Sequence, residues 1–131
     1  MPSDGEAARS AGQHVRPNMN GVVLRTKVWL EVGGDFVIGE GGLELLEALS
    51  SDGSLTRAAA QVDWSYRHAW GYLRRAERAL GVQLTLPLPG KGARRGMVLT
   101  PAGEDVVALL QRARDQVRRA VKSLSPASAP R

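Results

Sequence analysis

The chain has 131 residues, which suffices for one compact domain with tails but not for two domains with separate cores. Because it contains no cysteine, disulfides, thiol catalysis and cysteine-ligated zinc are excluded. Its 18 lysine and arginine residues against 13 acidic ones give a formal net charge of +5, which favours a polyanionic partner.

The two ends of the chain lack a periodic apolar pattern. Residues 1–20 are rich in glycine, alanine, serine and charge, and residues 125–131 read SPASAPR. Such segments bury too little apolar surface to offset the entropy of ordering. We therefore predict disordered tails at 1–20 and 125–131 and one folded domain at 21–124. No run approaches the roughly 18 apolar residues of a membrane span, and the start lacks an apolar signal segment, so we expect a cytoplasmic protein without a membrane partner.

The first patterned segment, VVLRTKVWLEV from Val22 to Val32, alternates between apolar and charged positions. This alternation predicts a half-buried strand, and the following GGD and FVIG predict a hairpin. Trp29 lies on the charged face. We expect it to pack against the returning strand, with contact to a partner subunit as the alternative.

Helical spacing follows in three consecutive segments. Leucines in EGGLELLEALSSDGS predict a helix that ends at Asp52-Gly53, and Ser54 is placed to cap a short helix over 55–61. After a break, residues 65–80 form the longest central amphipathic segment, closed by Gly81. Its apolar stripe is expected to comprise Ala69, Leu73, Ala76 and Leu80, widened by Trp70.

The remaining elements are two strand-like pieces and a long helix. Residues 82–88 and 97–100 flank the loop GKGARRG, which is the pattern of a β-wing, and Pro87 and Pro89 place the first piece at a sheet edge. Thr100-Pro101 is a helix start, and the apolar spacing continues to about Ser123. The fold class predicted is α+β, a winged helix-turn-helix with an N-terminal β-hairpin and a long C-terminal helix.

The first turn of the 65–80 helix carries the candidate DNA readers. A recognition helix needs an N-terminal turn whose side chains can reach base edges. Arg67 has the paired donors that suit guanine, while Tyr66 or Ser65 suits a phosphate or a thymine methyl. His68 is interpreted as a surface or DNA-facing residue because metal-ligand spacing is lacking around it. The alternative interpretation is that this turn is a solvent-exposed helix start that does not contact DNA.

The tryptophans beside this turn are expected to pack. We predict that Trp70 fills the core and that Trp64 covers the junction of the two helices, with stacking on nucleic acid as the alternative for Trp64.

All of the excess positive charge lies between residues 54 and 100, where only Asp63 and Glu77 are acidic. Such a concentration is typical of a nucleic-acid face, and binding through it should weaken with salt. In the wing, Lys91, Arg94 and Arg95 suit a phosphate backbone or a minor groove. A nucleotide-binding P-loop is rejected because these glycines run into a strand. The full basic set is Arg57, Arg67, Arg74, Arg75, Arg78, Lys91, Arg94 and Arg95.

The sequence shows no arrangement of residues that is typical of a catalytic site. Neither a paired acid and base on one predicted face nor a metal-ligand cluster stands out. We therefore predict a non-enzyme without a cofactor or a metal site.

The chain resembles the N-terminal DNA-binding domain of the ModE family of molybdate-responsive bacterial regulators, which is related to LysR-type winged helices. The resemblance covers about residues 24–122 and rests on KVWLEV, GEGGLELLEAL, GSLTRAAAQVDWSYRHAW and GKGARRGMVLTPAGE. It implies base reading by Ser65, Tyr66 and Arg67, backbone contacts by the wing, and a homodimer on a two-fold symmetric DNA site. The implied dimer surface comprises Val106, Leu109, Leu110, Ala113, Val117 and Val121.

Two differences from that family matter. Full-length ModE regulators carry C-terminal molybdate-binding domains, whereas this chain ends shortly after the last helix. The expectation is a regulator whose effector, if one acts, is sensed by a separate protein. The wing also has ARRG where the family tends to have more glycine. Two other functions remain open: a protein-protein adaptor on a winged-helix scaffold, and a nonspecific architectural DNA-binding protein.

Overall fold

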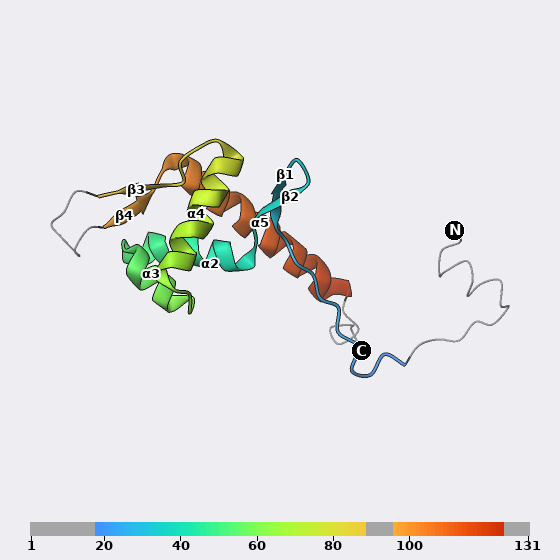
Figure 1. Ribbon diagram of the computed structural model, residues 1–131. Helices are drawn as coiled ribbons and strands as arrows, with labels where there is room; N and C mark the ends of the chain where they lie inside the picture. Colours follow the sequence, from blue (N-terminus) through green and yellow to red (C-terminus); the bar gives the residue numbers. More distant parts are fainter. Residues whose placement is uncertain (1–17, 89–95, 125–131) are drawn as a thin grey trace.

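The computed structural model describes residues 18–88 and 96–124 (Figure 1). Within these residues the order is hairpin, three helices, a second hairpin and a long helix. The predicted fold class, an α+β winged helix-turn-helix with an N-terminal hairpin and a long last helix, is confirmed. Most of the two predicted tails lies outside the described residues, as do the wing cations Lys91, Arg94 and Arg95.

The N-terminal hairpin pairs β1 (Leu30–Val32) with β2 (Asp35–Ile38) in antiparallel register. The prediction of a strand from Val22 was wrong, because the strand begins only at Leu30. The returning strand is four residues long, so it offers no ladder partner to the preceding segment. Consequently the alternating stretch before Leu30 is extended but largely exposed, and Val23 reaches 61% exposure.

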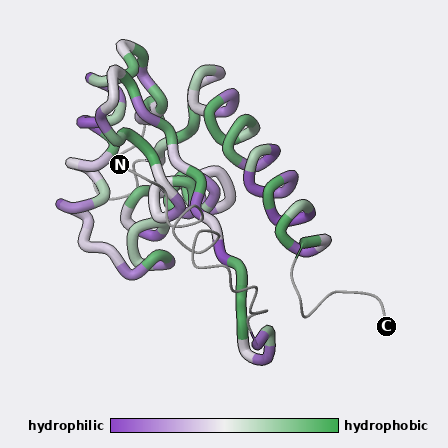
Figure 2. Tube along the Cα trace, turned by 90° about the vertical axis from the view of Figure 1, so that its right-hand side faces the viewer, coloured by the Kyte–Doolittle hydropathy of each residue, from purple (hydrophilic) through white to green (hydrophobic). Residues whose placement is uncertain are grey.

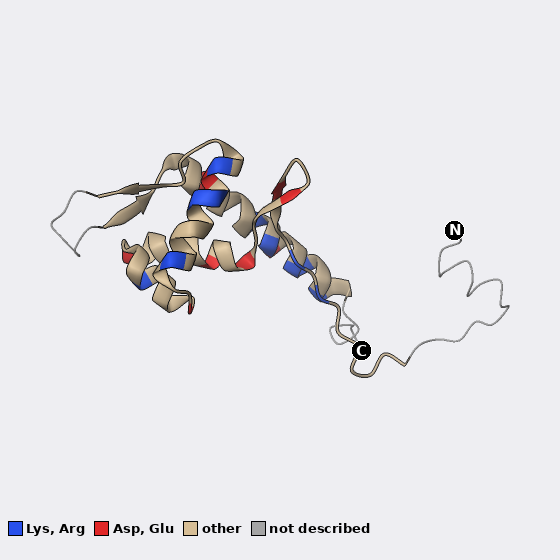
Figure 3. Ribbon diagram, in the orientation of Figure 1, with Lys and Arg blue, Asp and Glu red and all other residues tan. Residues whose placement is uncertain are grey.

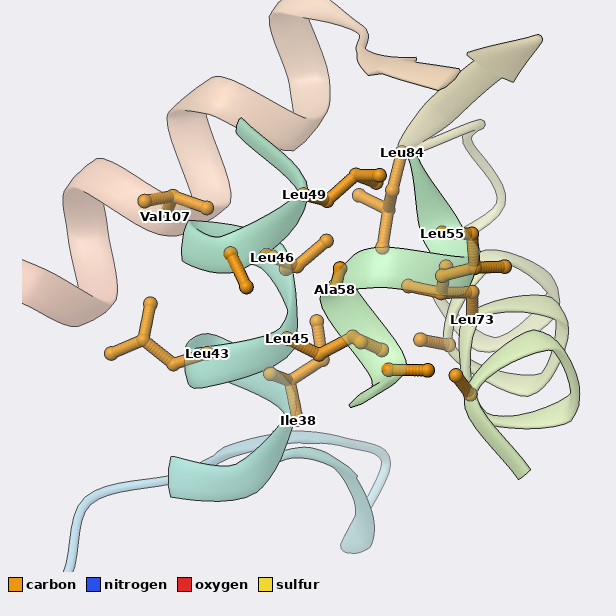
Figure 4. Close-up of a cluster of buried hydrophobic side chains, with 14 of the residues drawn as sticks. Ile38, Leu43, Leu45, Leu46, Leu49, Leu55, Ala58, Leu73, Leu84 and Val107 are labelled. Atoms are coloured by element: carbon orange, nitrogen blue, oxygen red, sulfur yellow. The ribbon is translucent and has the colours of Figure 1, made fainter. Parts of the chain in front are cut away.

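Helix α2 (Glu40–Asp52) is the centre of the core. Its predicted leucines Leu43, Leu46 and Leu49 are buried, together with Leu45, and its end at Gly53 is confirmed by a left-handed φ of 67°. Figure 4 shows these side chains close to buried side chains from other parts of the chain. The other core side chains labelled there are Ile38, Leu55, Ala58, Leu73, Leu84 and Val107.

The two helices of the helix-turn-helix are α3 (Leu55–Gln61) and α4 (Tyr66–Leu80). The bounds of α3 match the predicted 55–61, and Ser54 caps α3 as predicted. Helix α4 begins one residue later than predicted, because Ser65 is its N-cap and not its first residue. The Ser54 hydroxyl accepts from the Arg57 backbone N–H at 3.3 Å, and Gly81 ends α4 with a φ of 72°. Local capping chemistry therefore sets both helices, and packing on α2 sets their mutual placement.

The wing pairs β3 (Thr85–Pro87) with β4 (Met97–Leu99), and both strands are shorter than predicted. The Met97 N–H donates to the Gly53 carbonyl at 2.9 Å. This hydrogen bond joins the wing to the end of α2.

The last helix, α5 (Pro101–Leu124), begins as predicted at Thr100-Pro101. The Thr100 hydroxyl donates to the Gln83 carbonyl at 2.6 Å and accepts from the Gly103 N–H at 3.0 Å. The first half of α5 packs on the core, whereas its second half extends away from the domain (Figure 1). Green, hydrophobic segments recur along α5 to its end in Figure 2.

None of the helices in the described part of the chain combines the length and apolar character required to cross a lipid bilayer.

Candidate nucleic-acid interface

The first turn of α4 is held by its N-cap. The Ser65 hydroxyl accepts a hydrogen bond from the His68 backbone N–H at 3.0 Å, which satisfies one of the unpaired donors of the turn. Tyr66 is 51% exposed, and Arg67 is also exposed. The backbone is thus fixed while the Tyr66 and Arg67 side chains remain accessible to a ligand.

The opposite side of α4 is locked into the core. Ala69, Leu73 and Ala76 are buried at 0–2% exposure. With about 3.6 residues per turn, Arg67 and Arg75 lie on the side of α4 that faces away from these residues. Figure 3 shows blue segments along the visible length of α4 and one on α3. The outward side of the helix-turn-helix is therefore basic.

Arg57 supplies the basic position on α3. Its side chain is exposed, and its backbone N–H is bound by the Ser54 cap. In helix-turn-helix domains the first helix of the pair crosses the DNA backbone while the second enters the groove. The position of Arg57 is thus compatible with a phosphate contact.

His68 is exposed, yet its ring is engaged within the protein. It packs edge-on against Trp64 with ring centroids 4.3 Å apart and an interplanar angle of 75°. Trp64 itself lies against Gly41 of α2 and packs partly against the core. The His68 ring is therefore less available to DNA than Tyr66 or Arg67.

Tyr72 connects α4 to the start of α2. Its hydroxyl accepts from the Gly39 backbone N–H at 3.0 Å, and its ring lies 5.0 Å from that of Trp64. Burial raises the pKa of Tyr72 above the ordinary value of 10.0, although this hydrogen bond and the nearby Arg75 cation oppose the shift. Tyr72 orients α4 from the side opposite the wing connection, a role that the sequence did not reveal.

Arg74, a predicted DNA contact, is occupied inside the protein. Its Nε lies 3.1 Å from a carboxylate oxygen of Glu77, in an ion pair without hydrogen-bond alignment. Its Nη2 donates to the Thr85 hydroxyl at 3.1 Å, and its guanidinium lies over Trp70 at 5.5 Å. These contacts hold Arg74 against the wing strand.

The prediction that Trp70 fills the core was wrong, because Trp70 is 48% exposed. It is one position, or about 100°, around the helix from Ala69. Ala69 and Leu73 already occupy the line that faces α2 and α3, so the indole lies beside the core.

Glu77 is a residue whose role the sequence analysis missed. It is 8% exposed, and its Oε2 accepts from the backbone N–H groups of Leu84 at 2.8 Å and Thr85 at 3.3 Å. Its position one turn after Leu73 on the apolar stripe was the available signal. Glu77 ties α4 to the first residues of the wing.

The predicted dimer residues divide between core and surface. Leu110 is 2% exposed and belongs to the core of the single chain, and Val106 packs partly against that core. Leu109 is 47% exposed, and Ala113, Val117 and Val121 are half-buried. The accessible apolar part of this set is therefore smaller than the sequence suggested.

Over residues 18–88 and 96–124, no group of three or more histidine, aspartate or glutamate side chains is placed to hold a metal ion.

Comparison with known proteins places this site in a family. Residues 41–104 match the model of bacterial regulatory helix-turn-helix proteins of the lysR family. A 64-residue stretch is 39% identical to the molybdenum-pterin-binding protein MopB of Rhodobacter capsulatus, covering 49% of this chain and 24% of MopB. The matched family segment runs from the first turn of α2 to the first turn of α5. Residues 41–104 therefore form a helix-turn-helix domain of the LysR type.

Proposed function

We propose that the protein is a homodimeric, sequence-specific regulator of the ModE type whose α4 reads bases in the major groove. The observation that carries this proposal is the position of Arg67. It is exposed on the first turn of a helix whose other face is buried, so the side chain is presented on a rigid support. A guanidinium held in this way can donate two parallel hydrogen bonds to guanine O6 and N7.

Tyr66 and Ser65 complete the proposed reading turn. Tyr66 offers a phenol and an apolar ring edge, which suit a phosphate or a thymine methyl. The Ser65 hydroxyl oxygen already accepts a hydrogen bond from the His68 N–H. Its own O–H proton would be donated to a phosphate. Base discrimination is therefore assigned mainly to Arg67, with Tyr66 in support and His68 as a peripheral contact.

Backbone contacts would come from both sides of the reading turn. Arg57 on α3 and Arg75 on α4 are exposed cations of the helix-turn-helix. The wing cations Lys91, Arg94 and Arg95, which lie outside the described residues, extend the proposal to flanking DNA. Neutralising several phosphates releases counterions, so affinity should fall steeply as salt rises.

The dimer would form through the outer side of α5. Leu109 is 47% exposed, and Leu124, at the end of the helix, is 71% exposed. Ala113, Val117 and Val121 would join them, whereas Leu110 stays in the core. Two copies joined in this way present two α4 helices, as a two-fold symmetric DNA site requires.

The proposed link to molybdenum rests on the resemblance to ModE and on the similarity to MopB, whose name describes molybdenum-pterin binding. The aligned part makes up 24% of MopB. We infer that the regulated genes concern molybdenum and that the effector is sensed outside residues 41–104.

The test is selection of bound duplexes from random DNA by the full chain at physiological salt. The expected result is an enriched palindrome, together with retarded complexes that contain two copies of the chain. Salt-sensitive binding without any enriched sequence would replace this proposal with a nonspecific architectural role. Failure to bind DNA at all would favour the adaptor function.

A further inference from the structure

A groove beside α4 lies outside the turn that is proposed to read DNA bases. It lies between α4 and the Gly81–Gln83 connection to the wing and encloses about 530 Å³. Its most accessible apolar side chains are Trp70, 48% exposed, and Val82, 44% exposed. Two glycines, Gly71 and Gly81, also line it.

The groove is positively charged as well as apolar. Its one lining carboxylate, Glu77, is occupied by Arg74 and by two backbone N–H groups. Among the described residues, Arg75 and Arg78 form no ion pair, and both are exposed at the groove. The groove therefore presents a net positive charge next to an exposed indole.

The indole is held in place before any ligand arrives. Arg74 lies over the Trp70 ring at 5.5 Å, and Arg74 is itself fixed by Glu77 and Thr85. A pre-organised aromatic side chain loses little conformational entropy on binding. Tryptophan and arginine are also enriched among interaction hot spots.

We infer that this groove binds an acidic segment of another protein, with an apolar side chain on Trp70 and Val82 and a carboxylate on Arg78. Charge complementarity selects an acidic occupant, and the exposed apolar walls favour a peptide over a phosphate backbone, which has no apolar side chains. Along the helix axis, Trp70 is about 4.5 Å from Arg67, and Arg78 is about 16 Å from it. The inference requires that DNA on the first turn leave Trp70, Val82 and Arg78 accessible, so that DNA and the protein segment are bound together.

The test is affinity selection of a random peptide library on the full chain, in the presence of excess duplex DNA that occupies the DNA-binding face. The expected result is enrichment of peptides that combine several aspartate or glutamate residues with one leucine, phenylalanine or tryptophan. Each enriched peptide should lose at least about tenfold in affinity in the W70A variant and in the R78E variant. The R67A variant should bind the same peptides unchanged.

Two further measurements make the outcome decisive. The Trp70 indole is half exposed, so the thermal unfolding midpoint of W70A should remain close to that of the parent chain. Arg78 is also exposed, so R78E tests the groove with a second substitution outside the core. The DNA affinity of W70A should also match the parent. The inference fails if selected peptides lack acidic residues, if nothing is enriched, or if W70A and R78E retain full peptide affinity. It also fails if DNA displaces the peptides or if W70A weakens DNA binding, because the groove would then belong to the DNA interface.

Discussion

The Glu77 carboxylate accepts a hydrogen bond from the backbone N–H of Leu84 at 2.8 Å. Both residues are buried, and the bond spans the connection between α4 and the wing. The same oxygen also accepts from Thr85. A single side chain on α4 thereby fixes where the wing begins, which sets the spacing between the two proposed DNA-contacting elements.

Replacing Glu77 with alanine is expected to lower the free energy of unfolding by about 2–4 kcal/mol. The change leaves the buried Leu84 N–H without its acceptor and removes the carboxylate partner of Arg74. Urea denaturation measures the loss. The matched control is E44A on the exposed side of α2, which should change stability by less than about 0.5 kcal/mol. Equal effects of the two substitutions would contradict the bridging role of Glu77.

Tyr72 predicts a loss of stability at alkaline pH. Burial raises its pKa in the folded chain above the unfolded value of 10.0, so the folded state holds the phenolic proton more tightly. This contribution is complete below pH 10.0 and is lost as the pH rises through the folded pKa. Denaturation at about pH 9 and about pH 11 should show a decline for the parent chain that is smaller in Y72F. At the lower pH, Y72F should be less stable by about 1 kcal/mol, because the Gly39 N–H loses its acceptor.

Replacing Arg67 with alanine should reduce discrimination between the selected DNA site and variants of it by about 1–3 kcal/mol. The reason is loss of the two parallel hydrogen bonds proposed to guanine. Fluorescence anisotropy with the selected duplex and single-base variants measures the change. R78A removes the same charge from the same helix outside the proposed reading turn, so it should preserve discrimination. If R67A weakens binding to every sequence equally, Arg67 is a phosphate contact.

Replacing Leu109 with aspartate should weaken dimerisation at least about tenfold without unfolding the chain. Leu109 is 47% exposed, so the charge is tolerated in a monomer but not in an apolar contact between two α5 helices. Sedimentation equilibrium measures the dimer constant. A108D places the same charge on another exposed side of α5 and serves as the control. Unchanged dimerisation in L109D would move the proposed interface away from this side of α5.

The sequence was a good guide where structure depends on neighbouring residues. Ser54 and Ser65 cap α3 and α4, and Gly53 and Gly81 end α2 and α4. Each of these signals acts over a single turn: a hydroxyl accepts a nearby N–H, or a glycine adopts a positive φ. The bounds of α3 and α4 could therefore be read without knowing what packs on them.

The candidate site was only partly predictable. The reading turn from Ser65 to Arg67 follows from the cap and the helical period, and both elements are observed. Arg74 looked like another exposed cation, but Glu77 and Thr85 engage it across the wing connection. His68 likewise meets Trp64. Such pairings depend on where separate elements meet, which periodicity does not encode.

By itself, the sequence determined the order of the elements, the ends of the central helices and the basic character of the helix-turn-helix. Only the tertiary structure decided that the Trp70 side chain lies outside the core, that the Glu77 side chain is buried, and that the first strand begins at Leu30. The physical reason is the same in all three cases. Capping and periodicity act within one element, whereas burial and strand pairing exist only when another element supplies the opposing surface or ladder.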